Sequence, residues 1–212
     1  MSTTFVDINL LQLNRQDIFL AMGIPHQTHD ELSQTLLNAV EAEMKPIVKP
    51  QLCYRFIEKH DFVCGSIIAK ALENADKYAV IVATAGVEAE AWLKELQQQN
   101  IAKMYAADVA LSEVVEATMR KAIGEIQQKV LPNMVVGNPY SPGYCGWSLR
   151  EQKKLFACFD APPCGVTLND SCLMFPIKSV SAVVPIGANV VKQPYGCAVC
   201  SKEDCYKRKK TT

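Results

Sequence analysis

Residues 138–147 read Asn-Pro-Tyr-Ser-Pro-Gly-Tyr-Cys-Gly-Trp, a composition typical of a rigid binding loop. Pro139 and Pro142 fix their own φ angles and push the residue before each of them towards extended geometry. Gly143 and Gly146 permit backbone conformations that other residues avoid. We expect the loop to keep peptide N–H and C=O groups outside any strand ladder, where they can bind a flat polar ligand. Three aromatic side chains are available to stack on that ligand: Tyr140, Tyr144 and Trp147.

Cysteine is the second residue type whose spacing suggests chemistry. The chain has nine cysteines, and seven of them follow residue 140. An odd number in a chain of this size favours free thiols or a metal site over disulfides. Cys197 and Cys200 are separated by two residues, so they can bind one metal through a tight turn, with Cys205 as a third ligand. Tetrahedral zinc or an iron–sulfur cluster needs a fourth ligand, and the candidates for it are Cys145, Cys164, Cys172 and an exogenous group. The alternative to a metal site is that these cysteines are free surface thiols.

Charge and hydropathy argue against two classes of partner. Lys plus Arg and Asp plus Glu balance at 22 each, so the basic excess of a nucleic-acid-binding protein is missing. No apolar run approaches the roughly 18 residues that cross a bilayer. The N-terminus lacks the basic start and apolar stretch of a signal peptide. We therefore expect a cytoplasmic protein with no nucleic-acid or membrane partner.

The elements that position these residues are mostly helical in the first half. Asn14 caps a short helix that Gly23 ends. Apolar side chains recur on one face of residues 30–44, which predicts an amphipathic helix that Pro46 ends. A β-rich apolar run predicts a buried strand, and two helical stretches follow it; these elements cover residues 78–84, 87–99 and 102–130.

The second half predicts short strands around one helix. Ser148 and Glu151 have the spacing of a capping box, in which the serine hydroxyl accepts from the Glu151 amide, and the helix runs to about Phe159. The loop is then either a binding element or a plain turn between a strand and this helix. Helices first and strands later predict an α+β fold, with helices around a central, mainly antiparallel twisted sheet. The expected strands lie at 133–136, 172–175 and 179–185; one domain covers 1–192, including the N-terminal region at 1–75, and a Cys-rich appendage covers 193–212.

Two blocks of the second half carry a family resemblance. Ser141-Pro-Gly-Tyr144 is similar to the end of an Arg-x-x-Pro-Gly-Tyr loop, and residues 168–181 are similar to Leu-Thr-x-Ser-x-Met-x-Pro-x-x-Ser-Val-Ser. Both patterns, in this order, belong to the activation domain of cobalamin-dependent methionine synthase. Residues 105–116 also resemble the acidic helix that precedes the loop in that family. The resemblance covers residues 75–190, and the N-terminal third only loosely.

The resemblance implies a function in reactivation. The domain would bind S-adenosylmethionine and use it for reductive methylation of a cobalamin that has stalled as cobalt(II), with a flavodoxin-type electron donor. This chain contains no corrinoid-binding Asp-x-His-x-x-Gly segment, so it resembles a stand-alone component of a methyltransferase that acts in trans on methionine synthase or a related corrinoid protein. The residues that would contact the cofactor are Glu113, Glu116, Tyr140, Ser141, Pro142, Gly143, Tyr144 and Arg150.

Two positions depart from the family pattern and keep other functions open. The family's loop arginine, which would pair with the ligand carboxylate, is Pro139 here, and Arg150 or Lys178 would have to replace it. An aromatic residue expected after the Ser-Val-Ser element is Val184. One alternative is therefore a non-catalytic module that docks onto a corrinoid protein without binding the methyl donor. Another is a metal-binding regulatory protein that uses the C-terminal cysteines.

Overall fold

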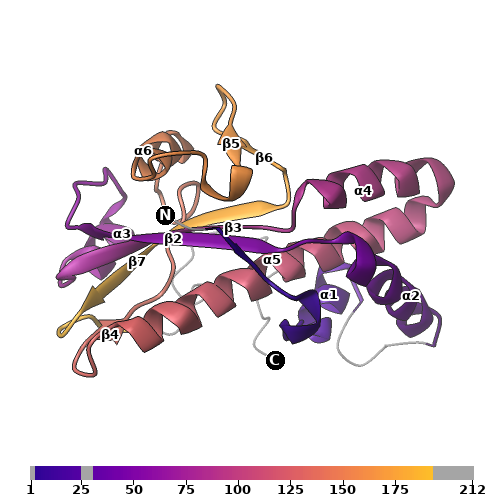
Figure 1. The fold of residues 1–212 in the computed structure, drawn as a ribbon, viewed down its shortest axis with the longest axis horizontal. Helices are drawn as coiled ribbons and strands as arrows, with labels where there is room; N and C mark the ends of the chain where they lie inside the picture. Colours follow the sequence, from indigo (N-terminus) through magenta and orange to yellow (C-terminus); the bar gives the residue numbers. More distant parts are fainter. Residues whose placement is uncertain (1–2, 25–30, 193–212) are drawn as a thin grey trace.

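An antiparallel sheet forms the centre of the computed structural model, which describes residues 3–24 and 31–192. Within these ranges the main sheet has five strands in the order β1-β2-β3-β7-β4 (Figure 1). The neighbouring strands all pair antiparallel. The strands are β1 (Thr4–Phe5), β2 (Gln51–Glu58), β3 (Lys77–Thr84), β7 (Ser179–Gly187) and β4 (Val135–Val136).

The two central strands are buried on both faces. In β3 every residue after Lys77 is buried, as the apolar run at 78–84 predicts. The register pairs Val80 with Val183 and Ile81 with Ala182. Because side chains alternate along a strand, the two pairs point to opposite faces. Val80 and Val183 belong to one hydrophobic cluster, and Ile81 and Ala182 belong to another.

Helices cover one face of the sheet. The long helix α5 (Ile101–Lys129) begins at Asn100, whose side chain accepts a hydrogen bond from the Lys103 amide at 3.0 Å. Its C-terminal half packs Met119, Ala122 and Ile126 against the sheet. Its N-terminal half forms a second layer with three more helices, α1 (Arg15–Ala21), α2 (Glu31–Ile47) and α4 (Val87–Gln99).

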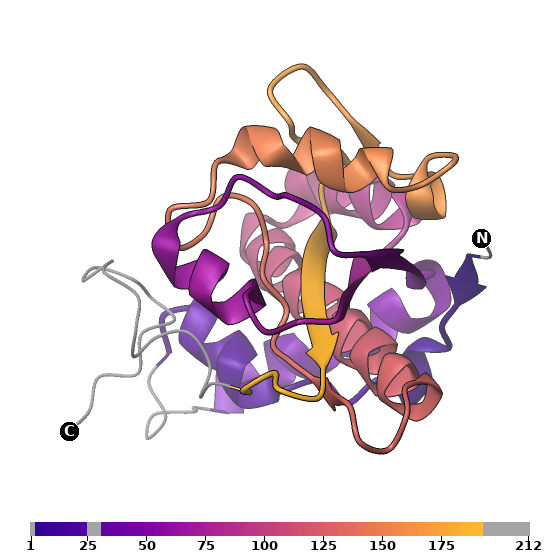
Figure 2. The ribbon, with the colours of Figure 1, turned by 90° about the vertical axis from the view of Figure 1, so that its left-hand side faces the viewer.

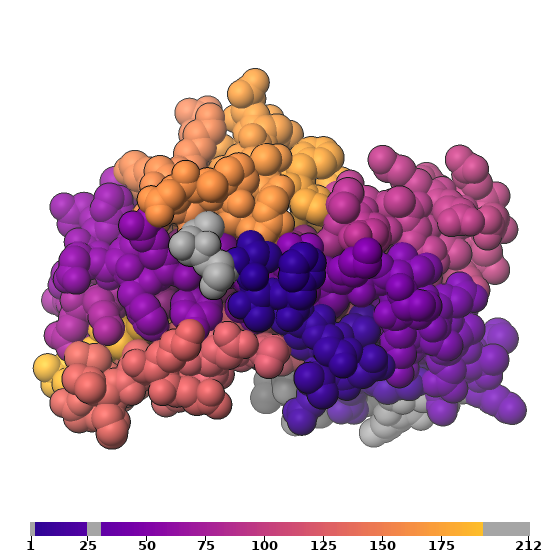
Figure 3. Space-filling model, viewed as in Figure 1, coloured from indigo at the N-terminus to yellow at the C-terminus, as the bar shows by residue number. Residues whose placement is uncertain are grey.

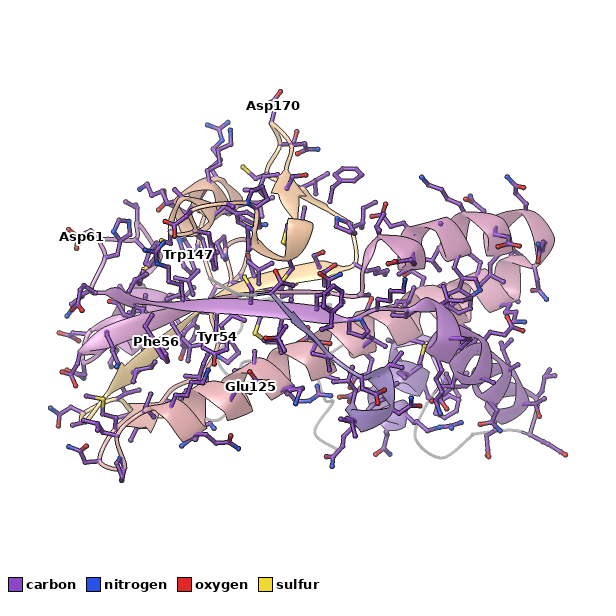
Figure 4. The ribbon with its side chains drawn as sticks, viewed as in Figure 1. Tyr54, Phe56, Asp61, Glu125, Trp147 and Asp170 are labelled. Carbon is purple, nitrogen blue, oxygen red and sulfur yellow. The ribbon has the colours of Figure 1, made fainter. Side chains whose placement is uncertain are left out.

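Shorter segments cover the opposite face. The chain from 147 to 175 lies across this face and forms a separate ridge on the surface (Figures 2 and 3). Trp147, Leu155 and Val166 pack there against the valines of β3 and β7. In Figure 4, Trp147 lies on this side of the sheet, whereas Tyr54 and Phe56 lie on the side of α5. The elements on this face are α3 (Ser66–Leu72), α6 (Gln152–Ala157), β5 (Thr167–Leu168) and β6 (Met174–Phe175), with 3₁₀ turns at Leu149–Glu151 and Pro163–Gly165. A further 3₁₀ turn, Ile8–Leu10, packs instead with the helices α1, α2, α4 and α5.

The α+β architecture confirms the fold class predicted from the sequence, and β3, α4 and α5 have close to their predicted bounds. Three local predictions were wrong. Pro46 does not end its helix but lies inside the last turn of α2. Ser148 starts a 3₁₀ turn in which its hydroxyl accepts from the Arg150 amide, not from that of Glu151, and the following helix ends at Ala157 rather than Phe159. None of the helices among the described residues is long and apolar enough to cross a membrane.

Candidate functional site

The loop at 138–147 begins as an extension of the sheet. After β4, the Gly137 amide donates to the carbonyl of Pro185 at 2.8 Å. Tyr140 then exchanges two main-chain hydrogen bonds with Val183, at 2.9 and 2.8 Å. The chain therefore follows the outer edge of β7 in extended geometry, as the prolines at 139 and 142 predict.

Beyond Tyr140 the loop folds back on itself. Gly143 and Gly146 have positive φ angles of 94° and 77°, which explains why glycine occupies both positions. The Gly143 amide donates to the carbonyl of Trp147 at 2.8 Å, and the Trp147 amide donates to that of Tyr144 at 2.9 Å. More peptide groups of the loop are therefore hydrogen-bonded within the protein than the sequence suggested. Within the described residues, the amides of Ser141 and Gly146 have no hydrogen-bond partner.

The three aromatic residues of the loop differ in accessibility. The side chain of Tyr144 is 70% exposed and can stack on a ligand. Tyr140 is half-buried, and burial raises the pKa of its phenol. Trp147 is only 2% exposed and packs edge-on against Phe62, with 5.6 Å between ring centroids. Its assignment as a stacking surface was wrong, because its ring belongs to the core.

A second segment, at residues 63–65, packs against the loop and the turn that follows it. Gly65, the residue before α3, lies so close to the loop that a Cβ atom added there would be 2.9 Å from the carbonyl oxygen of Cys145. The Val63 amide donates to the Glu151 carboxylate at 3.1 Å, which joins the same segment to the turn after the loop. Sequence reasoning missed this support. Glycine directly before a helix start was its only local signal.

The acidic residues predicted on α5 do not lie beside the loop. Glu113 is buried; its carboxylate accepts from the Asn14 amide at 2.9 Å and pairs with Arg120 at 2.6 Å. Glu116, one turn further along α5, is half-buried. The helix packs on one face of the sheet, whereas the loop packs through Trp147 on the other. The geometry thus assigns Glu113 to an internal contact.

The two cations that could replace the missing loop arginine are in different situations. The Lys178 ammonium pairs with Asp108 at 2.8 Å and donates to the Ser112 hydroxyl at 3.0 Å, so it is already engaged. Arg150 is exposed, and no ion pair joins its guanidinium to another described residue. It follows Leu149, whose Cδ1 atom would be 3.5 Å from a Cβ added at Gly143. Of these two cations, Arg150 is therefore the one that is available near the loop.

Two clefts lie elsewhere on the surface. One, of about 490 Å³, lies between α6 and β5 and is lined by Phe156, Pro163 and Leu168, among others. The other, of about 670 Å³, lies between α2, α4 and α5. Neither cleft is lined by a loop residue. A ligand at the loop would therefore contact its exposed rim, formed by Gly143, Tyr144 and Gly146.

The predicted metal ligands Cys197, Cys200 and Cys205 lie outside the described residues. Among the described residues, no group of three or more His, Cys, Asp or Glu side chains is arranged to hold a metal ion.

The chain is similar to known proteins both in sequence and in structure. Residues 51–211 match the family model described as "Vitamin B12 dependent methionine synthase, activation domain". This range covers more than half of the chain and includes the loop, the β7 segment and the C-terminal cysteines. The structure is similar to one described as the crystal structure of the MetH reactivation domain bound to AdoHcy, with a TM-score of 0.68 and 13% sequence identity over 92% of this chain and 80% of that one. At this identity the likeness shows the fold. No curated protein matches the sequence.

Proposed function

We propose that this chain, which belongs to the activation-domain family of vitamin B12-dependent methionine synthase, binds S-adenosylmethionine at the loop 138–147. It would use this ligand for reductive methylation of a cobalamin carried by a partner, either methionine synthase or a related corrinoid protein. The family match that includes the Ser-Pro-Gly-Tyr block is the observation that carries the proposal. The structural relative's description as bound to AdoHcy, which differs from S-adenosylmethionine by the methyl group, supports the ligand class.

The exposed rim of the loop offers suitable contacts. The Tyr144 ring provides a face on which a base can stack. The amides of Ser141 and Gly146 are free to donate to ligand oxygens or ring nitrogens. The positive φ of Gly143 keeps the turn open without a side chain. Together these groups suit a nucleoside that is held mainly by main-chain atoms.

Arg150 is the residue we assign to the ligand carboxylate. It takes the role of the family's loop arginine, whose position is Pro139 here. A guanidinium binds a carboxylate through two parallel hydrogen bonds. Lys178 is the less suitable cation because Asp108 and Ser112 already bind it.

The chain's contribution to the reaction is positioning. S-adenosylmethionine supplies an electrophilic methyl group, and one electron from a flavodoxin-type donor would balance the reduction of the cobalt. The loop must hold the sulfonium with its methyl group facing the partner and must exclude water from the contact, because correct alignment can supply several kcal/mol of the barrier, on the order of 7–11. No acid or base from the protein is required, so none is assigned.

Calorimetry tests this proposal directly. We expect the purified protein to bind S-adenosylmethionine, and Tyr144→Ala to weaken binding about tenfold because one stacking contact contributes on the order of 1–3 kcal/mol. Arg150→Ala should weaken it by about three- to tenfold, whereas Lys153→Ala removes an exposed charge three residues away and serves as the control. Absence of binding at millimolar ligand would contradict the proposal.

A non-catalytic docking module is the second candidate function. Two observations favour it: Pro139 replaces the carboxylate-binding arginine, and neither cleft is lined by the loop. Such a module would bind a corrinoid protein with the same affinity in the presence and absence of S-adenosylmethionine. Calorimetry with the corrinoid protein, with and without the methyl donor, separates the two functions.

A further inference from the structure

We propose that Cys53 and Cys164 form a redox modification site, at which a hydroperoxide oxidises the two thiols to a reversible disulfide. The disulfide joins strand β2 to the Pro163–Gly165 turn of the ridge at 147–175. This modification is distinct from the proposed function, because binding S-adenosylmethionine requires neither thiol.

The two cysteines come from the two sides of one packing contact. Cys53 lies in β2 and belongs to the hydrophobic cluster between the sheet and the ridge. Cys164 is the middle residue of the Pro163–Gly165 turn, which packs on β2 and β3. Its Sγ atom is 3.7 Å from the carbonyl oxygen of Val82, the residue that pairs with Cys53 in the antiparallel register. The Cys164 sulfur therefore lies over the same row of the sheet as the Cys53 side chain.

The two thiols also contact each other. The Cys164 thiol donates a hydrogen bond to the sulfur of Cys53. Accepting this hydrogen bond lowers the pKa of Cys53, although burial acts in the opposite direction. The same hydrogen bond, together with burial, raises the pKa of Cys164. Because the thiolate is the nucleophile in thiol oxidation, Cys53 is the thiol that reacts first.

The backbone of the turn favours a role for the pair beyond packing. Cys164 has a φ angle of 53°, in the left-handed region that residues other than glycine seldom adopt. Such a conformation costs free energy and persists where the surrounding structure holds it. A buried cysteine can fill space as a small apolar residue. Here the costly conformation also directs one thiol onto a second thiol, which packing alone does not require.

A small oxidant can reach the pair at the edge of the sheet. Strand β1 consists of Thr4 and Phe5, and continuing its register with β2 places Thr3 opposite Cys53. Thr3 is exposed, and its hydroxyl donates to the Cys164 sulfur. A two-residue edge strand with exposed side chains opens at little cost in free energy. Opening of β1 therefore admits a hydroperoxide to the pair while the central strands stay folded.

The oxidation takes two steps and balances with the hydroperoxide as the oxidant. The Cys53 thiolate attacks one peroxide oxygen and breaks the O–O bond, which leaves a sulfenic acid and, with hydrogen peroxide, releases one water after protonation. The Cys164 thiol then attacks the sulfenic sulfur, so the S–S bond forms and the hydroxyl group leaves as a second water with the thiol proton. The two thiols lose two electrons to the peroxide, and a dithiol reductant restores them.

The cross-link makes the folded chain harder to unfold. It closes the segment from Cys53 to Cys164, which includes α5 and the loop at 138–147. A disulfide restricts the unfolded chain more strongly when the closed segment is long. Oxidation therefore stabilises the ridge on the sheet under the conditions that also oxidise cobalt(I).

Peptide mapping by mass spectrometry of the full chain tests the site. The reduced protein is treated with a small excess of hydrogen peroxide, unfolded, alkylated at its remaining thiols and digested. We expect a peptide pair that joins Cys53 to Cys164, lighter by two hydrogen atoms than the reduced peptides, which a dithiol reductant separates. The oxidised protein should unfold at a higher urea concentration than the reduced protein. Cys53→Ala and Cys164→Ala should lose both effects.

Cys172→Ala is the matched control. Cys172 is also a buried residue of the ridge, 2% exposed, and it also has a left-handed φ angle, of 65°. It lies outside the hydrophobic cluster that contains Cys53 and Cys164. This variant should still form the cross-link and should still gain resistance to urea after treatment with peroxide.

Three results would overturn the proposal. They are full alkylation of Cys53 and Cys164 after peroxide treatment, linkage of either residue to a different cysteine in the folded protein, and a cross-linked chain that unfolds at the same urea concentration as the reduced one. The map of the parent protein needs no variant, and circular dichroism shows whether each variant is folded. Calorimetry with S-adenosylmethionine uses the reduced protein, so failure of this site and failure of the proposed function remain distinguishable.

Discussion

Gly65→Ala should displace the loop at 138–147, although the substituted residue lies far from this loop in the sequence. The added Cβ atom would be 2.9 Å from the carbonyl oxygen of Cys145 and 3.2 Å from that of Gly146. Gly65 has φ −62° and ψ 160°, which alanine adopts freely, so the backbone itself is not strained. The cost comes from overpacking against backbone that cannot rotate away, and such changes cost about 1–3 kcal/mol.

Gly124→Ala is the matched control for this substitution. Gly124 lies on the exposed face of α5, and a Cβ added there has no neighbour within 4 Å. Alanine in a helix interior is favoured over glycine by about 0.5–1 kcal/mol, so this variant should be more stable than the parent. The two substitutions add the same methyl group and are predicted to have opposite effects.

Urea denaturation and calorimetry measure the two consequences of Gly65→Ala. We expect a lower free energy of unfolding and, because the loop turn moves, weaker binding of S-adenosylmethionine. Gly124→Ala should raise the free energy of unfolding and leave affinity unchanged. If Gly65→Ala were as stable as Gly124→Ala, the packing of the α3 segment against the loop would be refuted.

Three further predictions concern buried groups. Trp147→Ala should lower the free energy of unfolding by about 3–5 kcal/mol, because the indole is core and not a ligand surface, and thermal unfolding measures the loss. Ser181→Ala should leave the free energy of unfolding unchanged or raise it, since the buried hydroxyl has no partner among the described residues. Thr84→Val should lower it by about 1–3 kcal/mol, because the Thr84 hydroxyl binds the Lys178 carbonyl and the Gly86 amide. Equal effects of the two substitutions in urea denaturation would contradict this contrast. Glu113→Gln should lower the free energy of unfolding by about 1–3 kcal/mol by weakening the contacts to Arg120 and Asn14, and it should not change ligand affinity. A tenfold loss of affinity would instead show that Glu113 belongs to the binding site.

The central strands could be predicted from the sequence because their signal is local. The run at 78–84 is apolar throughout and ends at Ala85-Gly86, and β3 has nearly these bounds. Strand β2 could not be predicted in the same way. Leu52, Tyr54 and Phe56 point to one face and Cys53 and Ile57 to the other, so no alternation of polar and apolar residues marks it.

The candidate site shows a similar division. The prolines and glycines of the loop determine its extended start and its tight turn, and both could be predicted. The different exposures of Tyr144 and Trp147 could not, because two aromatic residues three positions apart carry the same local signal. Trp147 packs against Phe62, which lies 85 positions earlier in the sequence than Trp147, and this contact buries Trp147 but not Tyr144.

Transfer of a labelled methyl group tests the central claim most directly. The protein is incubated with S-adenosylmethionine labelled on its methyl group, a corrinoid protein carrying cobalt(II) cobalamin, and a one-electron donor. We predict that the label appears on the corrinoid only when this chain is present, and more slowly with Tyr144→Ala. Label that stays on S-adenosylmethionine, or that transfers equally well without the chain, would contradict the account.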